Sequence, residues 1–162
     1  VGIGISVKFD DDDNKKPGWK FAEYEMKGVP LRIAIGPRDI ENKTVELARR
    51  DNLSKTTLSQ TDLSQKISKL LEQIQEDLFK KSSDFLKENI TFASTVEEMN
   101  DILNSKSGFV EAYWNGNSET EQKIKDITKA TIRCIPLEEN STGKCIISGD
   151  LNSKKVLFAR AY

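Results

Sequence analysis

Five residues between positions 17 and 39 have types and spacings that suit the recognition of a nucleic-acid base: Phe21, Glu25, Arg32, Arg38 and Asp39. An aromatic ring stacks on an unpaired base, a guanidinium donates two hydrogen bonds to guanine O6 and N7, and a carboxylate accepts from base N–H groups. The same residues also suit a solvated rim of salt bridges with Phe21 in the core. Residue types alone favour the rim.

A short helix must position the first two of these residues. Pro17 suits the first turn of a helix, which is predicted to end near Lys27 with Gly28 as its C-terminal cap. Phe21 and Glu25 lie four residues apart and would share one face of this helix.

A strand and a turn must position the other three. Apolar residues alternate over positions 31–35 and predict a strand whose apolar side chains are accounted for by packing. Arg32 would point to the opposite face of this strand. Arg38 and Asp39 follow directly after a Gly-Pro turn.

The segments on either side of this stretch predict further strands. Alternation from Ile3 to Phe9 indicates a strand with one buried face, and Val45 and Leu47 indicate another, which leads through Arg49, Arg50 and Asp51 into a polar loop. Four adjacent acids, positions 10–13, end the first strand. Calcium loops alternate their ligands and carry a glycine and a distal glutamate, so a solvated loop is favoured over a metal site.

The second half of the chain predicts a small mixed α/β unit. Residues 62–89 show the strongest helical pattern, with apolar residues at i, i+3 and i+4 along one face. Thr95 with Glu98 and Ser118 with Glu121 fit the capping-box spacing and predict two more helices. Strand-like runs follow at Phe109–Trp114, Thr131–Leu137, Lys144–Ile147 and Val156–Ala161.

Composition limits the kinds of chemistry that the 162 residues can support. Net charge is −1, with 11 Lys/Arg and 10 Asp/Glu in residues 1–60 and 14 and 16 in residues 61–162, so strong binding through phosphates alone is not expected. The chain has no histidine, which excludes Ser-His-Asp and Cys-His catalysis built from this chain alone.

Two cysteines do not indicate a disulfide framework and favour a reducing, cytoplasmic compartment. No run of about 18 apolar residues is present, so no membrane span is expected.

A long series of motifs resembles one known family. The motifs are PGWKF, the KGVPLRI run, the GPRD corner, the ARRD exit, ATIRCIPLEEN, GKCIISGD and KKVLFARAY. Together they resemble the anticodon-binding domain and the C-terminal domain of prolyl-tRNA synthetases, in the archaeal/eukaryotic-like branch. The resemblance covers essentially the whole chain.

The resemblance implies a role for each residue of the opening stretch. Phe21 would stack on an anticodon base, and Glu25, Arg32, Arg38 and Asp39 would hydrogen-bond base edges. Lys55, in the loop after ARRD, is a weaker member of the set because that loop varies in length. From charge and proximity we add that Lys16 and Lys20 could touch phosphates.

Relatives of this kind often hold zinc through four cysteines in the C-terminal domain. The matching positions here are Asn115, Thr120, Cys145 and Ser148, which leave a single thiolate. Since Asn, Thr and Ser are poor zinc ligands, we expect no metal there, and packing or side-chain hydrogen bonds must hold the loop instead. Cys134 is expected to be a small buried residue.

The resemblance also implies an architecture and a parent activity. The expected fold is α/β: an N-terminally incomplete anticodon-binding domain over residues 1–60, with a mixed sheet and helices, and a small α/β domain over 61–162. Because the chain opens within a strand pattern and without Met, we expect it to be part of a longer protein. The terminal Tyr162 would then be an anchored tail whose carboxylate reaches toward a catalytic domain; a frayed edge strand is the alternative.

The parent enzyme would ligate L-proline to proline tRNA with ATP and Mg, most simply as a cytoplasmic homodimer. Its partners would be the anticodon stem-loop and its own catalytic domain, and no membrane. The chain alone has no catalytic residues and is expected to be inactive. Two alternatives stay open: a freestanding anticodon-domain homologue with an accessory role, and a piece that mainly supports a dimer.

Overall fold

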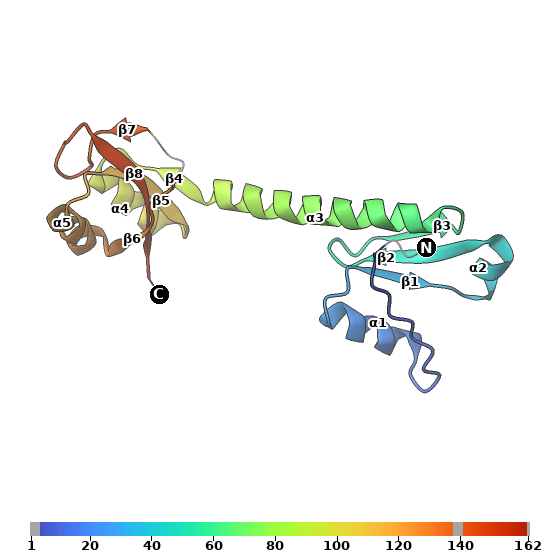
Figure 1. Cartoon of the computed structure of the whole chain (residues 1–162). Helices are drawn as coiled ribbons and strands as arrows, with labels where there is room; N and C mark the ends of the chain where they lie inside the picture. Colours follow the sequence, from blue (N-terminus) through green and yellow to red (C-terminus); the bar gives the residue numbers. More distant parts are fainter. Residues whose placement is uncertain (1–3, 138–140, 162) are drawn as a thin grey trace. The chain divides into compact units, whose positions relative to one another are not determined.

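The computed structural model describes residues 4–137 and 141–161, and the chain divides into two compact units. Unit 1 is residues 1–81 and unit 2 is residues 82–162. The division falls inside one long helix, α3 (Leu63–Glu88), which the apolar periodicity of residues 62–89 predicted (Figure 1). The predicted domain boundary after residue 60 lies just before this helix and stays a prediction.

Unit 1 is a three-stranded antiparallel sheet with a helix on each face (Figure 1). The strand order is β1-β2-β3, so β2 is central. Before α3, the elements in chain order are α1 (Pro17–Met26), β1 (Leu31–Ala34), α2 (Pro37–Asn42), β2 (Thr44–Arg49) and β3 (Lys55–Ser59).

The two faces of this sheet differ in what covers them. Val45 and Leu47 are buried and share a face with Arg49. Because Arg49 pairs with Asp77 of α3, this is the α3 side. Arg32 lies on the other face, against Phe21 of α1. The sheet therefore has an apolar side that holds α3 and a more polar side that holds α1.

Two predictions for unit 1 are wrong. The predicted strand from Ile3 to Phe9 is not one: the described part, from Gly4, has no regular secondary structure, and Val7 and Phe9 are 82% and 78% exposed. Alternation yields a strand only where a neighbouring strand accepts its hydrogen bonds, and none of the described strands does so. The predicted polar loop after Arg49 is a turn followed by β3, whose residues pair with β2.

Unit 2 is a five-stranded mixed sheet with two helices. The strand order is β4-β5-β8-β6, with β7 beside β8, and β4 and β5 are parallel. The elements are β4 (Ile90–Phe92), α4 (Val96–Ser105), β5 (Phe109–Trp114), α5 (Ser118–Thr128), β6 (Ala130–Cys134), β7 (Thr142–Gly143) and β8 (Ser153–Arg160). Its core contains Met99 of α4, Ile124 of α5 and Val110, Val156 and Phe158 of the sheet.

The predicted α4 start is confirmed, but three predictions for unit 2 need correction. Thr95 accepts a hydrogen bond from the Glu98 backbone N–H, and the Glu98 carboxylate accepts from the backbone N–H of the preceding residue, Ser94. For α5 the cap is Asn117 instead of Ser118. Lys144–Ile147 is not a strand, because its backbone closes a turn in which Gly149 N–H donates to Cys145 O. Cys134 is exposed, not buried, at an irregular point of the β6–β8 pairing.

Within residues 4–137 and 141–161, no helix combines the length and the apolar composition needed to cross a bilayer.

Candidate functional site

Three of the predicted site residues meet on the α1 side of the unit 1 sheet. The Arg32 guanidinium lies over the Phe21 ring, 3.4 Å from its centroid. Its Nη2 atom is 3.8 Å from Glu25 Oε1. Phe21 and Glu25 share a helix face as their spacing predicted, and β1 brings Arg32 up to that face. The structure thus assembles a ring, a cation and a carboxylate in one place.

The burial of β1 is the reverse of what its apolar alternation suggested. The Arg32 side chain is only 15% exposed, whereas Ile33 is 39% exposed. Arg32 Nε and Nη1 are buried and have no hydrogen-bond partner among the described residues. A buried donor without an acceptor is costly, and more so on a charged group. Arg32 therefore presents two donors that an incoming acceptor would satisfy.

A small, partly open pocket lies at this cluster. Its volume is about 10 Å³, close to that of one water molecule. A base cannot enter it without movement of a side chain. Because Arg32 already covers one face of the Phe21 ring, a stacking base must displace the guanidinium or use the rest of the ring. The lining residues are Phe21, Tyr24, Glu25, Val29, Arg32, Ala48, Arg49 and Arg50.

Lys55 lies on the same sheet face as Arg32. Arg32 pairs with Ala48 of β2, and Ala48 pairs with Lys55 of β3, so the three form one cross-strand row. Lys55 is exposed, with Nζ 3.8 Å from Glu46 Oε1. Ala48, between the two cations in this row, is buried.

Arg38 and Asp39 are on α2 and do not line this pocket. Asp39 Oδ2 accepts a hydrogen bond from the Gly36 backbone N–H and its Oδ1 accepts from Thr44 Oγ1, each at 3.0 Å. The carboxylate therefore caps the start of α2 and ties it to β2. Arg38 is exposed.

Two arginines that the sequence interpretation used only as part of the ARRD motif hold the site together. Arg49 Nε and Nη2 donate to the two Asp51 carboxylate oxygens at 3.0 and 2.6 Å, and Nη2 also donates to Asp77 of α3 at 2.7 Å. These hydrogen bonds lower the pKa of Asp51. Arg50 Nε donates to the Glu25 backbone carbonyl at 2.7 Å and so ties the end of α1 to β2.

The sequence contained a partial signal for these contacts. Arg49 and Asp51 are two residues apart, and an arginine that meets a carboxylate is often bidentate, so their proximity in sequence made this pair a candidate. The partners Asp77 and Glu25 are far away in sequence and carry no such signal.

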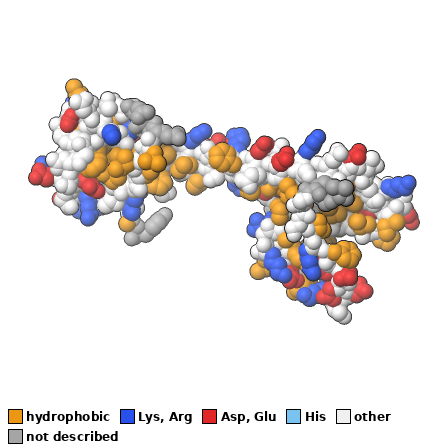
Figure 2. Space-filling model, in the orientation of Figure 1, with side chains coloured by type: hydrophobic (Ala, Val, Ile, Leu, Met, Phe, Trp, Pro, Cys, Tyr) orange, Lys and Arg blue, Asp and Glu red, His pale blue; other side chains and the backbone are white. Residues whose placement is uncertain are grey.

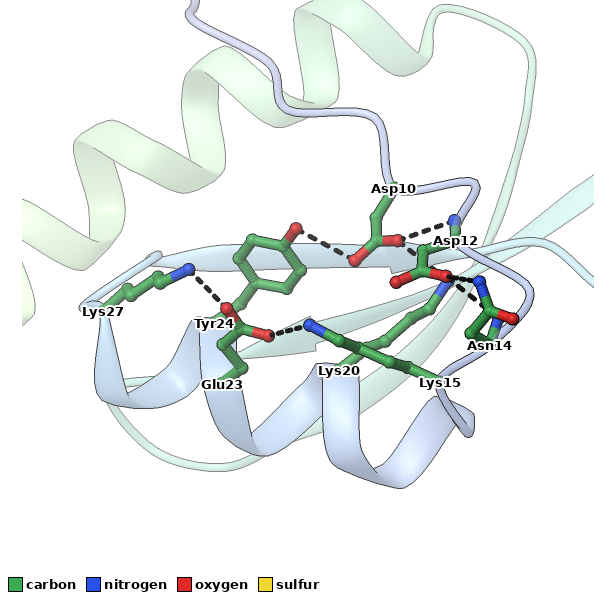
Figure 3. A network of polar contacts seen from close by, with 8 residues as sticks. All are labelled: Asp10, Asp12, Asn14, Lys15, Lys20, Glu23, Tyr24 and Lys27. Carbon is green, nitrogen blue, oxygen red and sulfur yellow. Dashed lines mark hydrogen bonds and ion pairs between the residues drawn. The ribbon is translucent and has the colours of Figure 1, made fainter.

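The acidic run is not simply solvated, because Asp10 anchors it to α1 (Figure 3). Asp10 accepts hydrogen bonds from Lys20 Nζ at 2.8 Å and from the Tyr24 hydroxyl at 2.9 Å. The bond from Lys20, followed by the bond from the Asp12 backbone, lowers the pKa of Asp10 to about 2. Lys20, which we expected to reach phosphates, is thus already paired. Lys16 is exposed at the N-cap of α1.

Charges around α1 are mixed. Figure 2 shows Lys, Arg, Asp and Glu side chains side by side over α1 and the loop before it. A surface of this kind attracts a polyanion weakly, so binding there depends on specific contacts.

The four zinc-like positions of unit 2 come together as a hydrogen-bonded group. Thr120 Oγ1 donates to Asn115 Oδ1 at 2.7 Å, and Asn115 Nδ2 donates to Ser148 Oγ at 3.2 Å. Burial raises the pKa of the Cys145 thiol, but hydrogen bonds from Ser148 and from neighbouring backbone groups outweigh it, and the net pKa is lowered. In the part of the chain that the structure describes, no three His, Cys, Asp or Glu side chains converge as a metal site requires.

Two protein-family models match the chain. The model described as "Anticodon binding domain" matches residues 3–70, and the model described as "Prolyl-tRNA synthetase, C-terminal" matches residues 96–162. Together they account for parts of both units.

Curated relatives and a solved structure agree with these models. The proline–tRNA ligase of Christiangramia forsetii is 50% identical over 161 residues, which are 99% of this chain and 33% of that protein. The proline–tRNA ligase of Cytophaga hutchinsonii is 54% identical over 159 residues, 98% of this chain and 32% of that protein. The chain therefore spans about a third of the length of these relatives.

A crystal structure of prolyl-tRNA synthetase from Cryptosporidium parvum, complexed with L-proline and AMP, has the same fold. It matches with a TM-score of 0.87 and 39% identity, over 98% of this chain and 34% of that one. The predicted α/β fold class is confirmed by this match.

Proposed function

Because this chain belongs to the prolyl-tRNA synthetase family, we propose that its unit 1 recognises the anticodon of proline tRNA through the cluster of Phe21, Glu25 and Arg32. The observation that carries the proposal is the Arg32 guanidinium. It is buried beside an aromatic ring and a carboxylate, and two of its donors have no acceptor among the described residues.

Guanine has the complementary groups for this cluster. Its O6 and N7 atoms accept two hydrogen bonds from one guanidinium. Its N1–H and N2–H groups donate on the Watson–Crick edge and match the Glu25 carboxylate. The Phe21 ring offers a stacking surface for a base splayed out of the loop. Proline anticodons share two guanines, so each of these groups has a partner.

Binding requires Arg32 to change its contacts. In the structure the guanidinium covers one face of Phe21. When a base stacks on the ring, Arg32 moves from ring to base edge and its unpaired donors gain acceptors. The cost of leaving the ring is offset by charge-assisted hydrogen bonds, which are about twice as strong as neutral ones.

The remaining residues have secondary parts in the proposal. Lys55 lies across Ala48 from Arg32, on the face where the anticodon would lie. Arg38 and Asp39 would contact a base beyond the end of β1. For Asp39 this means accepting a further hydrogen bond while it caps α2, which a carboxylate's several lone pairs allow.

The activity of the longer protein is part of the same proposal. It would activate L-proline with ATP and Mg²⁺ and esterify proline to tRNA in the cytoplasm, most simply as a homodimer. The catalytic residues would belong to a domain outside this chain, and the chain alone would be inactive. Tyr162, proposed as a tail that reaches that domain, lies outside the described residues.

We also propose that unit 2 holds its loop without zinc. Asn115, Thr120, Cys145 and Ser148 offer one thiolate where structural zinc takes four Cys or His ligands, so the donor set does not fit the metal. Elemental analysis of the purified chain should give no stoichiometric zinc, and thermal unfolding should be unchanged by EDTA. One zinc per chain would contradict this.

The anticodon proposal is tested by binding of the chain to the anticodon stem-loop of proline tRNA. Replacing both anticodon guanines by adenine, in an otherwise identical RNA, should weaken binding by about 10- to 100-fold. The stem and the phosphate count are unchanged in this comparison. Equal affinity for the two RNAs would mean that unit 1 does not read these bases.

A further inference from the structure

We propose that Asp10 is a positioning residue of the anticodon site, which fixes the rotation of α1 and thereby the directions of Phe21 and Glu25. This inference rests on the proposed function of the cluster. Asp10 lies outside the pocket, in the acidic loop before the helix, and is not itself a base contact.

Apolar packing alone holds α1 only weakly. None of the ten residues of α1 is fully buried, and Phe21 and Tyr24 are partly buried. A helix without a fully buried side chain gains limited orientation from the hydrophobic effect. Yet α1 carries two of the three residues of the cluster. Polar contacts must therefore contribute to its orientation.

One carboxylate, that of Asp10, makes two of these polar contacts with α1. Asp10 Oδ1 is 2.8 Å from Lys20 Nζ, and Oδ2 accepts from the Tyr24 hydroxyl at 2.9 Å (Figure 3). Lys20 and Tyr24 are one turn apart on α1, so a single carboxylate holds the helix at two points. The Asp12 backbone N–H donates to Oδ1 at 3.1 Å and fixes the carboxylate in turn.

Helical geometry links these two contacts to the directions of Phe21 and Glu25. Phe21 and Glu25 each follow directly after one of the two held residues. Consecutive residues on an α-helix lie about 100° apart around the axis, so holding the line from Lys20 to Tyr24 sets the line from Phe21 to Glu25. Tyr24 connects the two directly, because it lines the pocket and its hydroxyl binds Asp10.

Asp10 is distinguished from the other acids of its run. Its side chain is only 20% exposed, whereas Asp11 and Asp13 are exposed residues. Asp12 accepts hydrogen bonds from Asn14 within the loop. The lowered pKa of Asp10, about 2, is consistent with a carboxylate that stays charged and paired.

Asp10→Asn tests the inference, with Asp11→Asn as the matched control. Both variants remove one negative charge from the same loop. Only Asp10→Asn replaces a carboxylate oxygen that accepts a hydrogen bond from α1. The new NH₂ group cannot accept from Lys20 Nζ or the Tyr24 hydroxyl. The measured quantity is the ratio of affinities for the proline anticodon stem-loop and its guanine-replaced form. We expect this ratio to fall about three- to tenfold in Asp10→Asn and to stay unchanged in Asp11→Asn.

Further variants separate positioning from charge and from loss of fold. Tyr24→Phe removes one of the two hydrogen bonds between α1 and Asp10 without changing the charge. This variant should also lower the affinity ratio. Asp10→Glu keeps the charge and both carboxylate oxygens. Its affinity ratio should lie between that of Asp10→Asn and that of wild type. Circular dichroism should show an unchanged helix content in all variants.

The outcomes distinguish this inference from the proposed function. A wild-type ratio well above one, with the same ratio in Asp10→Asn, would overturn the positioning role and leave anticodon reading intact. Equal loss in Asp10→Asn and Asp11→Asn would also overturn it, because charge alone would then explain the effect. A wild-type ratio of one would overturn both.

Discussion

Three arginines of unit 1 differ in what their guanidinium groups contact. Arg49 pairs with two carboxylates, through Nε and Nη2. Arg50 donates to a backbone carbonyl. Arg32 alone of these three has buried donors without an acceptor. At the scale of single residues, the first two stabilise the fold and the third is available to a ligand.

Replacement of Arg49 by alanine should destabilise unit 1 at neutral pH. The change leaves Asp51, whose side chain is 8% exposed, and Asp77 without their cation. We expect a loss of about 1–3 kcal/mol in the free energy of unfolding. Native-state hydrogen exchange of β2 amides measures it. Arg133→Ala, at an exposed arginine of β6 in unit 2, is the control and should leave those amides unchanged.

This contribution should depend on pH in a defined direction. Asp51 has a lowered pKa in the folded state, so between its ordinary value of 3.8 and that lowered value the unfolded chain binds more protons. The stabilisation is therefore present above about pH 4 and is lost as pH falls through the lowered pKa. The difference between wild type and Arg49→Ala should shrink over this window. A constant difference down to pH 2 would contradict the assignment.

The connection between α1 and β1 depends on one glycine. Gly28 has φ +82°, a conformation that costs other residues about 1–2 kcal/mol. Its backbone N–H donates to Glu25 O, the same carbonyl that accepts from Arg50. The end of α1, and with it Glu25, is set by this turn.

Gly28→Ala should therefore lower the stability of α1 by about 1 kcal/mol. Gly18→Ala is the matched control, because Gly18 lies inside the helix and a Cβ there would contact nothing within 4 Å. It should be neutral or stabilise by up to about 1 kcal/mol. Hydrogen exchange of α1 amides measures both, and equal effects of the two substitutions would refute this explanation of the turn.

Elements with local signals could be predicted from the sequence, and those that depend on distant partners could not. The proline start and glycine end of α1, and the apolar periodicity of α3, are local and were right. β3 was missed because mainly polar residues, such as Thr56 and Thr57, become a strand only by pairing with β2. The segment before Asp10 was wrong for the opposite reason: its alternation is present but no described strand pairs with it.

The same distinction applies to the site. The shared face of Phe21 and Glu25 follows from helical spacing, and the placement of Arg32 opposite Ile33 follows from strand alternation. That Arg32 is the more buried of the two depends on α1 folding back over β1, which no local pattern contains. The attachments through Asp10 and Arg50 likewise join residues that are 10 or more positions apart.

The whole chain is close to electrically neutral, with a net charge of −1. Its acids are placed so that Lys20 and Arg49, two cations near the cluster, are already paired. An RNA partner therefore gains little from counterion release at these cations. At the scale of the molecule, discrimination must come from specific base contacts, such as those open to the two unpaired nitrogens of Arg32.

The most direct test of this central claim couples Arg32 to the guanines. Wild type and Arg32→Ala are each measured with the proline anticodon stem-loop and with its guanine-replaced form, and the four affinities give an interaction free energy. We predict a coupling of about 1–3 kcal/mol. Arg133→Ala should show none. A coupling below about 0.3 kcal/mol for Arg32, with the fold intact, would mean that Arg32 has only a structural role and does not read the anticodon.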